Sequence, residues 1–492
     1  MKPGTPTPSA FSELANRVVA TLDQYRQHSQ KGEEKVLRHT AVGPLTQTLD
    51  LEKWIRTGGL DHTNLEDFLT PYLAASQHVH SPAFIGHQVA VPHRGAIMGD
   101  LIHGVTNNAM AVYEMGPSAT IVERVIVNWM LEKAGWFSSD QLSDFSAHPG
   151  NGAGVLTHGG SLANLTAVLA ARAAAFPRAW QDGTPDNLAI IAPAATHYSI
   201  SRAASIAGMG QNAVYPAPVN ALDQLRAGQL ESVYRRACDD GKTVFMMSLN
   251  ACATATGLYD PIDEVADFCA AHNLWLHVDG AHGASALLSE KHRHHLKGVS
   301  RADSLTWDAH KMLRTSALCA AILFKDPASL SHAFSQEGSY IFYEENHPGF
   351  DVGRTTIECT KAALGAKLFM VLAIEGEKAL GQFVEKQYDD TRTFYEQIAA
   401  QDDFECPYQP QSNILCFRYL PLGDNQAQMN LRQEIVRRGN FYITTAMINQ
   451  TRYLRLAVMN PLTSTATITA LLDEVRTCAK DQNSDCTPSS SR

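Results

Sequence analysis

The chain of 492 residues lacks the features of several large protein classes. Its nine cysteines occur singly, with no Cys-x-x-Cys pair, so no disulfide framework is expected. No apolar run is long enough to span a membrane, and the N-terminus has no apolar signal core. The formal net charge is -10, so no nucleic-acid partner is expected. These absences predict a cytoplasmic protein without membrane or nucleic-acid contacts.

The remaining composition is that of a folded protein, with 45% hydrophobic and 18% charged residues. The densest basic run, Lys-His-Arg-His-His at 291–295, has a spacing that fits no zinc pattern. A solvated loop is the favoured interpretation of this run, and no metal is expected. The length is sufficient for roughly two or three domains.

Apolar strand-like runs alternate with helical patterns between residues 154 and 325. They lie at 188–192, 244–248, 274–278 and 318–323. Continuous apolar strands that alternate with helices are typical of a parallel sheet covered on both faces. Ligands of such sheets bind at the carboxyl ends of the strands. Asp279 and Lys311 both follow apolar runs of this kind.

The flanking regions have other patterns. Residues 12–69 predict helices, residues 361–399 predict one long helical stretch, and strands are predicted at 414–418 and 453–457. The predicted division is an N-terminal helical segment over 1–100, a large α/β domain over 101–370, a small α+β domain over 371–480 and a disordered tail over 481–492.

Lys311 and Asp279 together suit one cofactor. Pyridoxal phosphate needs a lysine to hold its aldehyde as a Schiff base and an acid to keep its ring nitrogen protonated. A lone lysine is usually a surface charge, and an aspartate after a strand is often a helix N-cap. Taken singly, both residues leave these alternatives open.

Two other segments have the chemistry of a phosphate and ring site. At 157–172 the glycines Gly159 and Gly160 break into a strong helix pattern, with Ser161 at the expected N-cap. The N-terminus of a helix binds anions through free N–H groups and its dipole. His197 follows the run at 188–192, where an imidazole can stack on a flat ring; a structural histidine is the alternative.

The order of these elements is a glycine-rich turn, a histidine, Asp-x-Ala and His-Lys. It resembles that of the group II pyridoxal-phosphate amino-acid decarboxylases, which act on glutamate, cysteine sulfinate, diaminobutyrate or aromatic amino acids. The resemblance runs from about residue 80 to residue 461. It implies the aspartate-aminotransferase-like fold (fold type I), with a mostly parallel sheet flanked by helices and a small C-terminal α+β domain. It also implies a homodimer with sites at the interface and N-terminal helices around the partner.

Carried over by position, the resemblance implies a role for each matching residue. Lys311 holds the cofactor aldehyde, Asp279 pairs with the ring nitrogen and His197 stacks over the ring. Further contacts to the phosphate and ring come from Gly160, Ser161, His310, Ala281 and Thr254.

The resemblance also implies residues for the substrate. Arg455 grips the α-carboxylate and Tyr340 supplies a proton to the reacting carbon, although a salt bridge and a packing aromatic are the respective alternatives. Residues 82–88 match the family's His-Pro-x-Phe-Phe segment, which lines the substrate pocket and here includes Phe84 and His87. His87 stands near the position where glutamate decarboxylases have a carboxylate-binding glutamine.

Two segments depart from the family pattern. The usual Trp-Asn-Pro-His-Lys is Trp-Asp-Ala-His-Lys at 307–311, and Cys-Thr-Lys replaces Cys-Gly-Arg at 359–361. A carboxylate at Asp308 would repel a phosphate unless it is turned away or neutralised. The phosphate role of the asparagine is therefore not transferred to Asp308.

The expected activity is α-decarboxylation of an L-amino acid to an amine and CO2, with a diaminobutyrate-type or acidic amino acid favoured as the substrate. An aldehyde synthase, an aminotransferase or another lyase on the same fold is the first alternative. A non-catalytic regulatory homologue is the second, and the presence of Lys311, Asp279 and His197 argues against it. The sequence does not specify the substrate side chain.

Overall fold

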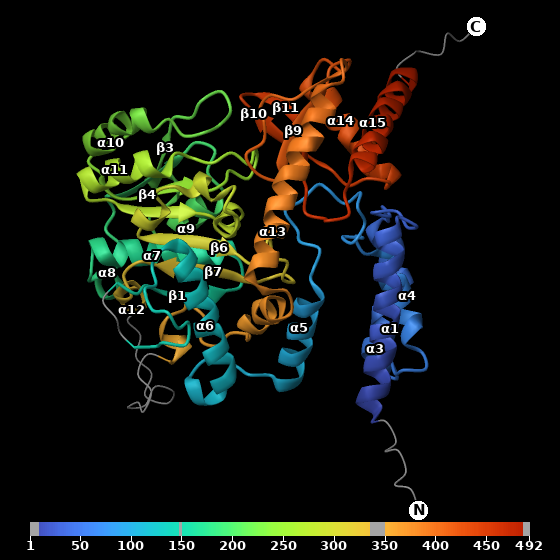
Figure 1. Cartoon of the computed structure of the whole chain (residues 1–492), viewed down its shortest axis with the longest axis horizontal. Helices are drawn as coiled ribbons and strands as arrows, with labels where there is room; N and C mark the ends of the chain where they lie inside the picture. Colours follow the sequence, from blue (N-terminus) through green and yellow to red (C-terminus); the bar gives the residue numbers. More distant parts are fainter. Residues whose placement is uncertain (1–8, 147–149, 335–349, 486–492) are drawn as a thin grey trace, which may run out of the picture.

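The computed structural model describes residues 9–146, 150–334 and 350–485 (Figure 1). A large domain is built on a seven-stranded sheet in the order β1-β7-β6-β5-β4-β2-β3, and a smaller domain on a four-stranded sheet in the order β10-β11-β9-β8. The strands of the large sheet are β1 (Ala153–Thr157), β2 (Leu188–Pro193), β3 (Val214–Ala217), β4 (Thr243–Asn250), β5 (Trp275–Asp279), β6 (Ser304–Asp308) and β7 (Ala320–Phe324).

The prediction of a mostly parallel sheet is confirmed, with one exception. β7 runs antiparallel to both of its neighbours, β1 and β6, whereas the pairs from β6 to β3 are parallel. A parallel crossover needs a dozen or more residues and usually a helix. The connection from β6 to β7, residues 309–319, has no helix, so the chain turns back beside the strand it has just left.

Helices cover both faces of the large sheet and form two cores. The face that packs against Ile190, Met246 and Ile322 is covered by α7 (Gly160–Ala175), α9 (Ser199–Ile206) and α12 (Ala328–Ala333). The other face is covered by α6 (Pro117–Ala134), α10 (Leu230–Asp239), α11 (Ile262–His272) and α13 (Gly365–Ala399). A short helix, α8 (Ala179–Asp182), follows α7.

The small domain has its own core. Its elements are β8 (Phe404–Glu405), β9 (Ile414–Tyr419), β10 (Thr444–Ile448), β11 (Thr451–Ala457), α14 (Asn425–Arg438) and α15 (Thr465–Asp485). Ile85 of the N-terminal segment is fully buried in this core, and its N–H donates to Tyr442 O at 3.1 Å. α13 connects the two domains, with a break at Gly376 (φ 77°). It starts before the predicted boundary at 370, and α15 continues past residue 481.

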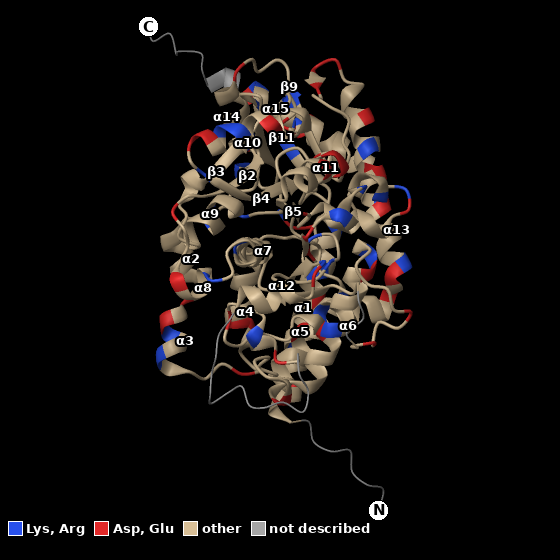
Figure 2. Cartoon of the chain, turned by 90° about the vertical axis from the view of Figure 1, so that its left-hand side faces the viewer, with Lys and Arg blue, Asp and Glu red and all other residues tan. Residues whose placement is uncertain are grey.

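The N-terminal helices stand beside the rest of the chain (Figure 1). They are α1 (Ala10–Lys31), α2 (Val42–Leu49), α3 (Leu51–Thr57) and α4 (Leu65–Ala75), followed by α5 (Arg94–Thr106), which packs on α13. The segment after α1 contacts the small domain through a hydrogen bond from Val36 N–H to Gly439 O at 2.8 Å. Among the described residues, no helix has the length and apolarity to cross a membrane. Figure 2 shows acidic and basic residues interspersed over the surface.

The departure at 359–361 places a lysine in the interior. The side chain of Lys361 is 0% exposed and forms an ion pair with Glu123 of α6. Both members of the pair also bind the backbone of Leu156, the Lys361 amine at its carbonyl (2.6 Å) and the Glu123 carboxylate at its N–H (3.1 Å). Lys361 therefore joins α6 to β1 and is not a charge at the cavity.

Candidate active site

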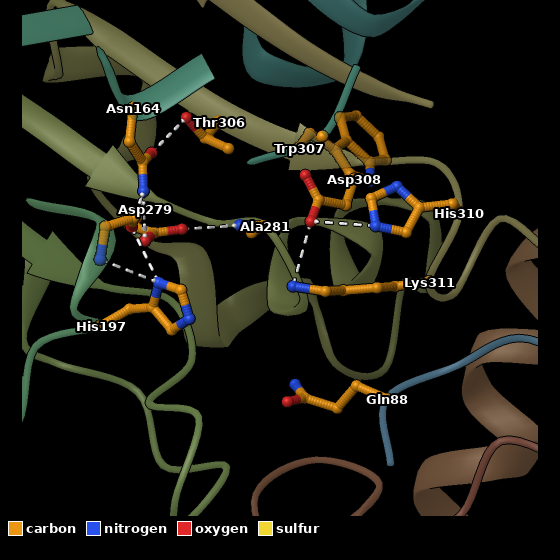
Figure 3. A network of polar contacts seen from close by, with 12 residues as sticks. Gln88, Asn164, His197, Asp279, Ala281, Thr306, Trp307, Asp308, His310 and Lys311 are labelled. Atoms are coloured by element: carbon orange, nitrogen blue, oxygen red, sulfur yellow. Dashed lines mark hydrogen bonds and ion pairs between the residues drawn. The ribbon is translucent and has the colours of Figure 1, made fainter. Parts of the chain in front are cut away.

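A cavity of about 310 Å³ lies at the carboxyl ends of β5 and β6, beside the N-terminus of α7. All eight residues predicted to hold the cofactor line it. They are Lys311, Asp279, His197, Gly160, Ser161, His310, Ala281 and Thr254. Figure 3 shows Asp279 and His197 on one side and Asp308, His310 and Lys311 on the other. Among the described residues, no group of three or more His, Cys, Asp or Glu is placed to hold a metal.

The alternation of side chains in β5 and β6 builds the floor of the cavity. Leu276, Val278, Leu305 and Trp307 belong to the core on the far face. Because successive side chains of a strand point to opposite faces, the polar residues between them face α7. This places a buried polar row under the helix, made of His277, Asp279, Ser304, Thr306 and Asp308.

Asn164 of α7 connects this polar row. Its Nδ2 donates to Asp279 Oδ2 and to Ser199 Oγ, both at 2.8 Å. Its Oδ1 accepts from Thr306 Oγ1 at 2.7 Å and from His277 Nε2 at 3.1 Å. All four hydrogen-bonding positions of the amide are used, which fixes its orientation. Asn164 is not among the residues predicted from the sequence; the available signal was a polar residue one helical turn after Gly160.

The network also fixes the histidines. Burial lowers the pKa of His277 to about 4, so the ring is neutral and donates through Nε2. Ser199 Oγ accepts from Asn164 and donates to His197 Nδ1 at 2.8 Å, and Ser199 N–H adds a second contact to Nδ1 at 3.3 Å. The proton of neutral His197 therefore lies on Nε2. Burial, followed by the charge of Lys311, lowers the pKa of His197 despite the opposing effect of Asp279.

Asp279 is the last residue of β5 and is 7% exposed. Oδ1 accepts from Ala281 N–H at 3.2 Å, and Oδ2 accepts from Asn164. The alternative of a helix N-cap is wrong, because the turn after Asp279 is followed by a short 3-10 helix at Gly283–Leu288 whose N-cap is His282. Two donors thus aim a buried carboxylate into the cavity.

Lys311 lies three residues beyond the end of β6, and Asp308 is the residue at the strand end. The Nζ of Lys311 is 3.0 Å from Asp308 Oδ2. Burial lowers the pKa of Lys311, but the carboxylates of Asp308 and Asp279 outweigh it, so the pKa lies above its usual value of 10.5. In this state the amine is a charged partner of Asp308.

The glycine-rich turn differs from the prediction at one point. α7 begins at Gly160 with Gly159 as its N-cap, so Ser161 lies inside the first turn and is not the cap. Gly159 has φ 105°, a conformation that glycine adopts readily. A Cβ on Gly160 would lie 2.8 Å from Asp308 Oδ1, so a side chain there would force the Asp308 carboxylate to move. Among the hydrogen bonds of the described residues, none is donated by the N–H of Gly160 or Ser161.

Arg455 does not line the cavity, and its guanidinium is fully engaged. It is 5% exposed, and its N–H groups reach Thr254 O, Ala255 O, Gly86 O, Thr444 Oγ1 and Gln88 Oε1 at 2.7–3.3 Å. A guanidinium has five N–H donors, and each has an acceptor here. A salt bridge, the alternative from the sequence, is not what holds it. Backbone carbonyls and side-chain oxygens do.

No residue of the segment at 82–88 is among the described residues that line the cavity. Phe84 is fully buried and stacks on Tyr442 with centroids 5.4 Å apart, so it does not reach the cavity. His87 is exposed and lies beside the same tyrosine. Gln88 is the residue that lies on the side of Lys311 (Figure 3), and its buried Nε2 has no partner among the described residues. Tyr340 lies outside the described residues.

The comparisons with known proteins identify the family of the chain. The conserved domain of pyridoxal-dependent decarboxylases matches residues 62–420. The acidic amino acid decarboxylase GADL1 of Mus musculus is 27% identical over 467 residues, which cover 91% of this chain and 82% of that protein. The cysteine sulfinic acid decarboxylase of Rattus norvegicus is 26% identical over 479 residues, 94% of each chain.

A solved structure shows the same fold over nearly the whole chain. The crystal structure of mouse CSAD has a TM-score of 0.88 at 25% sequence identity and covers 96% of this chain and 99% of that one. The chain therefore belongs to the pyridoxal-dependent decarboxylase family and is a pyridoxal-phosphate-dependent amino-acid decarboxylase.

Proposed function

We propose that the enzyme removes the α-carboxylate of an acidic L-amino acid, giving the amine and CO2, and that its cofactor occupies the cavity beside α7. The observation that carries the placement is the pair of opposed groups, the oriented carboxylate of Asp279 and the amine of Lys311 (Figure 3). These are the two groups that the cofactor requires of a protein.

The donor set fits pyridoxal phosphate. The N–H groups of Gly160 and Ser161, which donate no hydrogen bond among the described residues, lie at the N-terminus of α7 and can bind the phosphate of the cofactor. Asp279 suits the protonated ring nitrogen, and the small Ala281 leaves room for the ring beside neutral His197. One residue does not fit the charge of the phosphate: the carboxylate of Asp308 lies against Gly160.

When bound, pyridoxal phosphate supplies an electron sink for the electrons left behind by CO2. Asp279 would keep a proton on the ring nitrogen, because two hydrogen bonds stabilise its carboxylate. Lys311 would hold the cofactor aldehyde through its amine. His197, with its proton on Nε2, would be an uncharged group beside the ring.

The electrostatics around the substrate segment favour a negatively charged side chain. His87 is exposed at one side, and partial burial of its ring, followed by the charges of Arg455 and Arg432, lowers its pKa. An anionic group beside His87 would therefore meet two positive charges. The names of the two relatives, which are acidic amino acid and cysteine sulfinic acid decarboxylases, support the same substrate class.

The first prediction concerns activity and substrate. With glutamate, aspartate, cysteine sulfinate, 2,4-diaminobutyrate and tyrosine as substrates, we expect kcat/KM for CO2 release to be at least about ten-fold higher for an acidic substrate, because the positive field at His87 binds it.

Lys311→Ala should lose both CO2 release and the visible absorbance of the bound cofactor. Lys291→Ala, which removes an exposed lysine paired with Asp389, is the matched control. Activity in Lys311→Ala, or a preference for tyrosine, would contradict the proposal.

A substitution at Tyr340 tests whether the enzyme is a decarboxylase or an aldehyde synthase. From the sequence match alone we propose it as the proton donor after CO2 leaves. Tyr340→Phe should then turn over with oxygen and release ammonia and hydrogen peroxide, neither of which the wild type makes. CO2, ammonia and peroxide are measured in the same reaction. Clean amine production by Tyr340→Phe at the wild-type rate would remove Tyr340 from this role.

Asn164 provides a test of the cofactor placement. Asn164→Leu leaves Asp279 without one of its two donors, and a hydrogen bond to a charged group contributes about 1.5–3 kcal/mol. Cofactor affinity, titrated by absorbance, should fall by about ten- to a hundred-fold. Asn187→Leu removes an exposed amide bonded to Thr243 and is the control. If Asn164→Leu keeps the wild-type fold and affinity, the ring does not bind at Asp279.

We also propose that two copies pair through α5. This helix exposes Leu101 (45%), Ile102 (46%) and Val105 (62%), and Leu318 at the cavity wall is 46% exposed. Apolar side chains gathered this way mark an interface. A second copy would cover them and close the cavity on the side of Leu318.

The corresponding prediction concerns the mass of the assembly in solution, which should change when α5 is altered. Wild type should sediment at twice the chain mass, and Leu101→Asp with Val105→Asp should shift it to the monomer and lower activity, because charge is costly in an apolar interface. Leu420→Asp, at an apolar residue of the small domain that is 45% exposed, is the control. A fully active wild-type monomer would contradict the pairing.

A further inference from the structure

Asp308 is the charged group in the cavity that the function does not use. It is 2% exposed. Oδ2 contacts Lys311 Nζ at 3.0 Å and lies 3.6 Å from His310 Nε2. Oδ1 is buried and has no hydrogen-bond partner among the described residues. The carboxylate is thus held by one cation and is otherwise unsatisfied.

The carboxylate of Asp308 lies beside the proposed phosphate site. A Cβ built on Gly160 would lie 2.8 Å from Oδ1 and 2.9 Å from Oδ2, so the carboxylate packs against the first residue of α7. The N–H of Asp308 donates to Ala281 O at 3.0 Å, which fixes its backbone. An anion bound at the N-terminus of α7 therefore meets this carboxylate.

Cofactor binding would bring a second anion beside Asp308. The phosphate carries about −1.5 to −2 charges at neutral pH, whereas a Schiff base at Lys311 can keep its positive charge. A buried carboxylate beside a second anion is strongly disfavoured, and neutralisation relieves the repulsion. A neutral carboxyl also has an O–H that can donate to a phosphate oxygen.

We propose that Asp308 takes up one proton from solvent as pyridoxal phosphate binds, so that a carboxyl group becomes a hydrogen-bond donor to the phosphate. In the free enzyme the same side chain is the ionised partner of Lys311. Asp308 is therefore a positioning residue that couples retention of the cofactor to pH. The inference rests on the cofactor placement proposed above.

Other titratable groups surround Asp308 and must be separated from it. They are Lys311 and His310 after β6, Asp279 on β5, His197 after β2, His158 before α7 and Cys319 before β7. His310 is the nearest alternative carrier of the proton. If it carried the proton alone, the uptake would persist after Asp308 is replaced by an amide.

The experiment compares two probes, pyridoxal 5'-phosphate and pyridoxal, which lacks the phosphate. At about pH 8 free phosphate is already dianionic, and wild type should take up about one more proton with pyridoxal phosphate than with pyridoxal, measured with a pH indicator in weak buffer. Asp308→Asn, of the same shape, should lose this difference. The wild-type measurement stands whether or not the variant folds.

Affinity gives the second readout. From about pH 6 to about pH 9, the affinity of wild type for pyridoxal phosphate should fall relative to that of Asp308→Asn, by up to about ten-fold per pH unit, because one proton must be bound. The ratio for pyridoxal should stay constant. Glu358→Gln removes another carboxylate near the cavity, the partner of His158 at 2.7 Å, and should keep the wild-type pH dependence.

Each result decides the matter. Equal proton uptake in wild type and Asp308→Asn, an equal pH effect with pyridoxal, or the same change in Glu358→Gln would overturn the inference and leave the cofactor placement intact. A wild type that binds no pyridoxal phosphate would instead refute the proposed function, and the inference with it.

Discussion

The amide of Asn164 is the contact on which the geometry of the site depends. It joins α7 to the polar side chains of β5 and β6, and all its hydrogen-bonding positions are used. Gly160 is four residues earlier and lies on the same face of the helix. One helix therefore sets the separation between the proposed phosphate end and the ring-nitrogen end at Asp279. Loss of the amide would leave several buried polar groups unpaired, which costs more than the bonds themselves contribute.

Charge in the cavity follows from the same framework. Two buried carboxylates, Asp279 and Asp308, face the single amine of Lys311. Asp279 accepts hydrogen bonds from two N–H donors. Asp308 Oδ2 lies 3.0 Å from Lys311 Nζ and 3.6 Å from His310 Nε2, and Oδ1 has no hydrogen-bond partner among the described residues. The two carboxylates are chemically alike, but N–H donors hold one of them and the amine of Lys311 holds the other.

The sequence predicts the strands well because continuous apolar runs such as 188–192 are buried on both faces, and Asp279 falls at a strand end as expected. It does not predict the direction of β7, which depends on the length of a connection. The role of Asn164 was hidden for another reason. Asn164 and its partner His277 are polar residues within apolar elements, but they are 113 residues apart in the sequence. Only the packing of helix on sheet brings them together.

The availability of the Arg455 guanidinium could not be predicted from the sequence. The family resemblance implies that Arg455 grips a carboxylate, but whether the guanidinium is available depends on backbone carbonyls, which every sequence has. Here Thr254 O and Gly86 O, from two separate segments, occupy the guanidinium at 2.7 and 3.0 Å. The remaining side-chain acceptors include Gln88 Oε1 at 3.2 Å. Arg455 thus holds the Gln88 amide with its oxygen toward the guanidinium, while the buried Nε2 has no partner among the described residues.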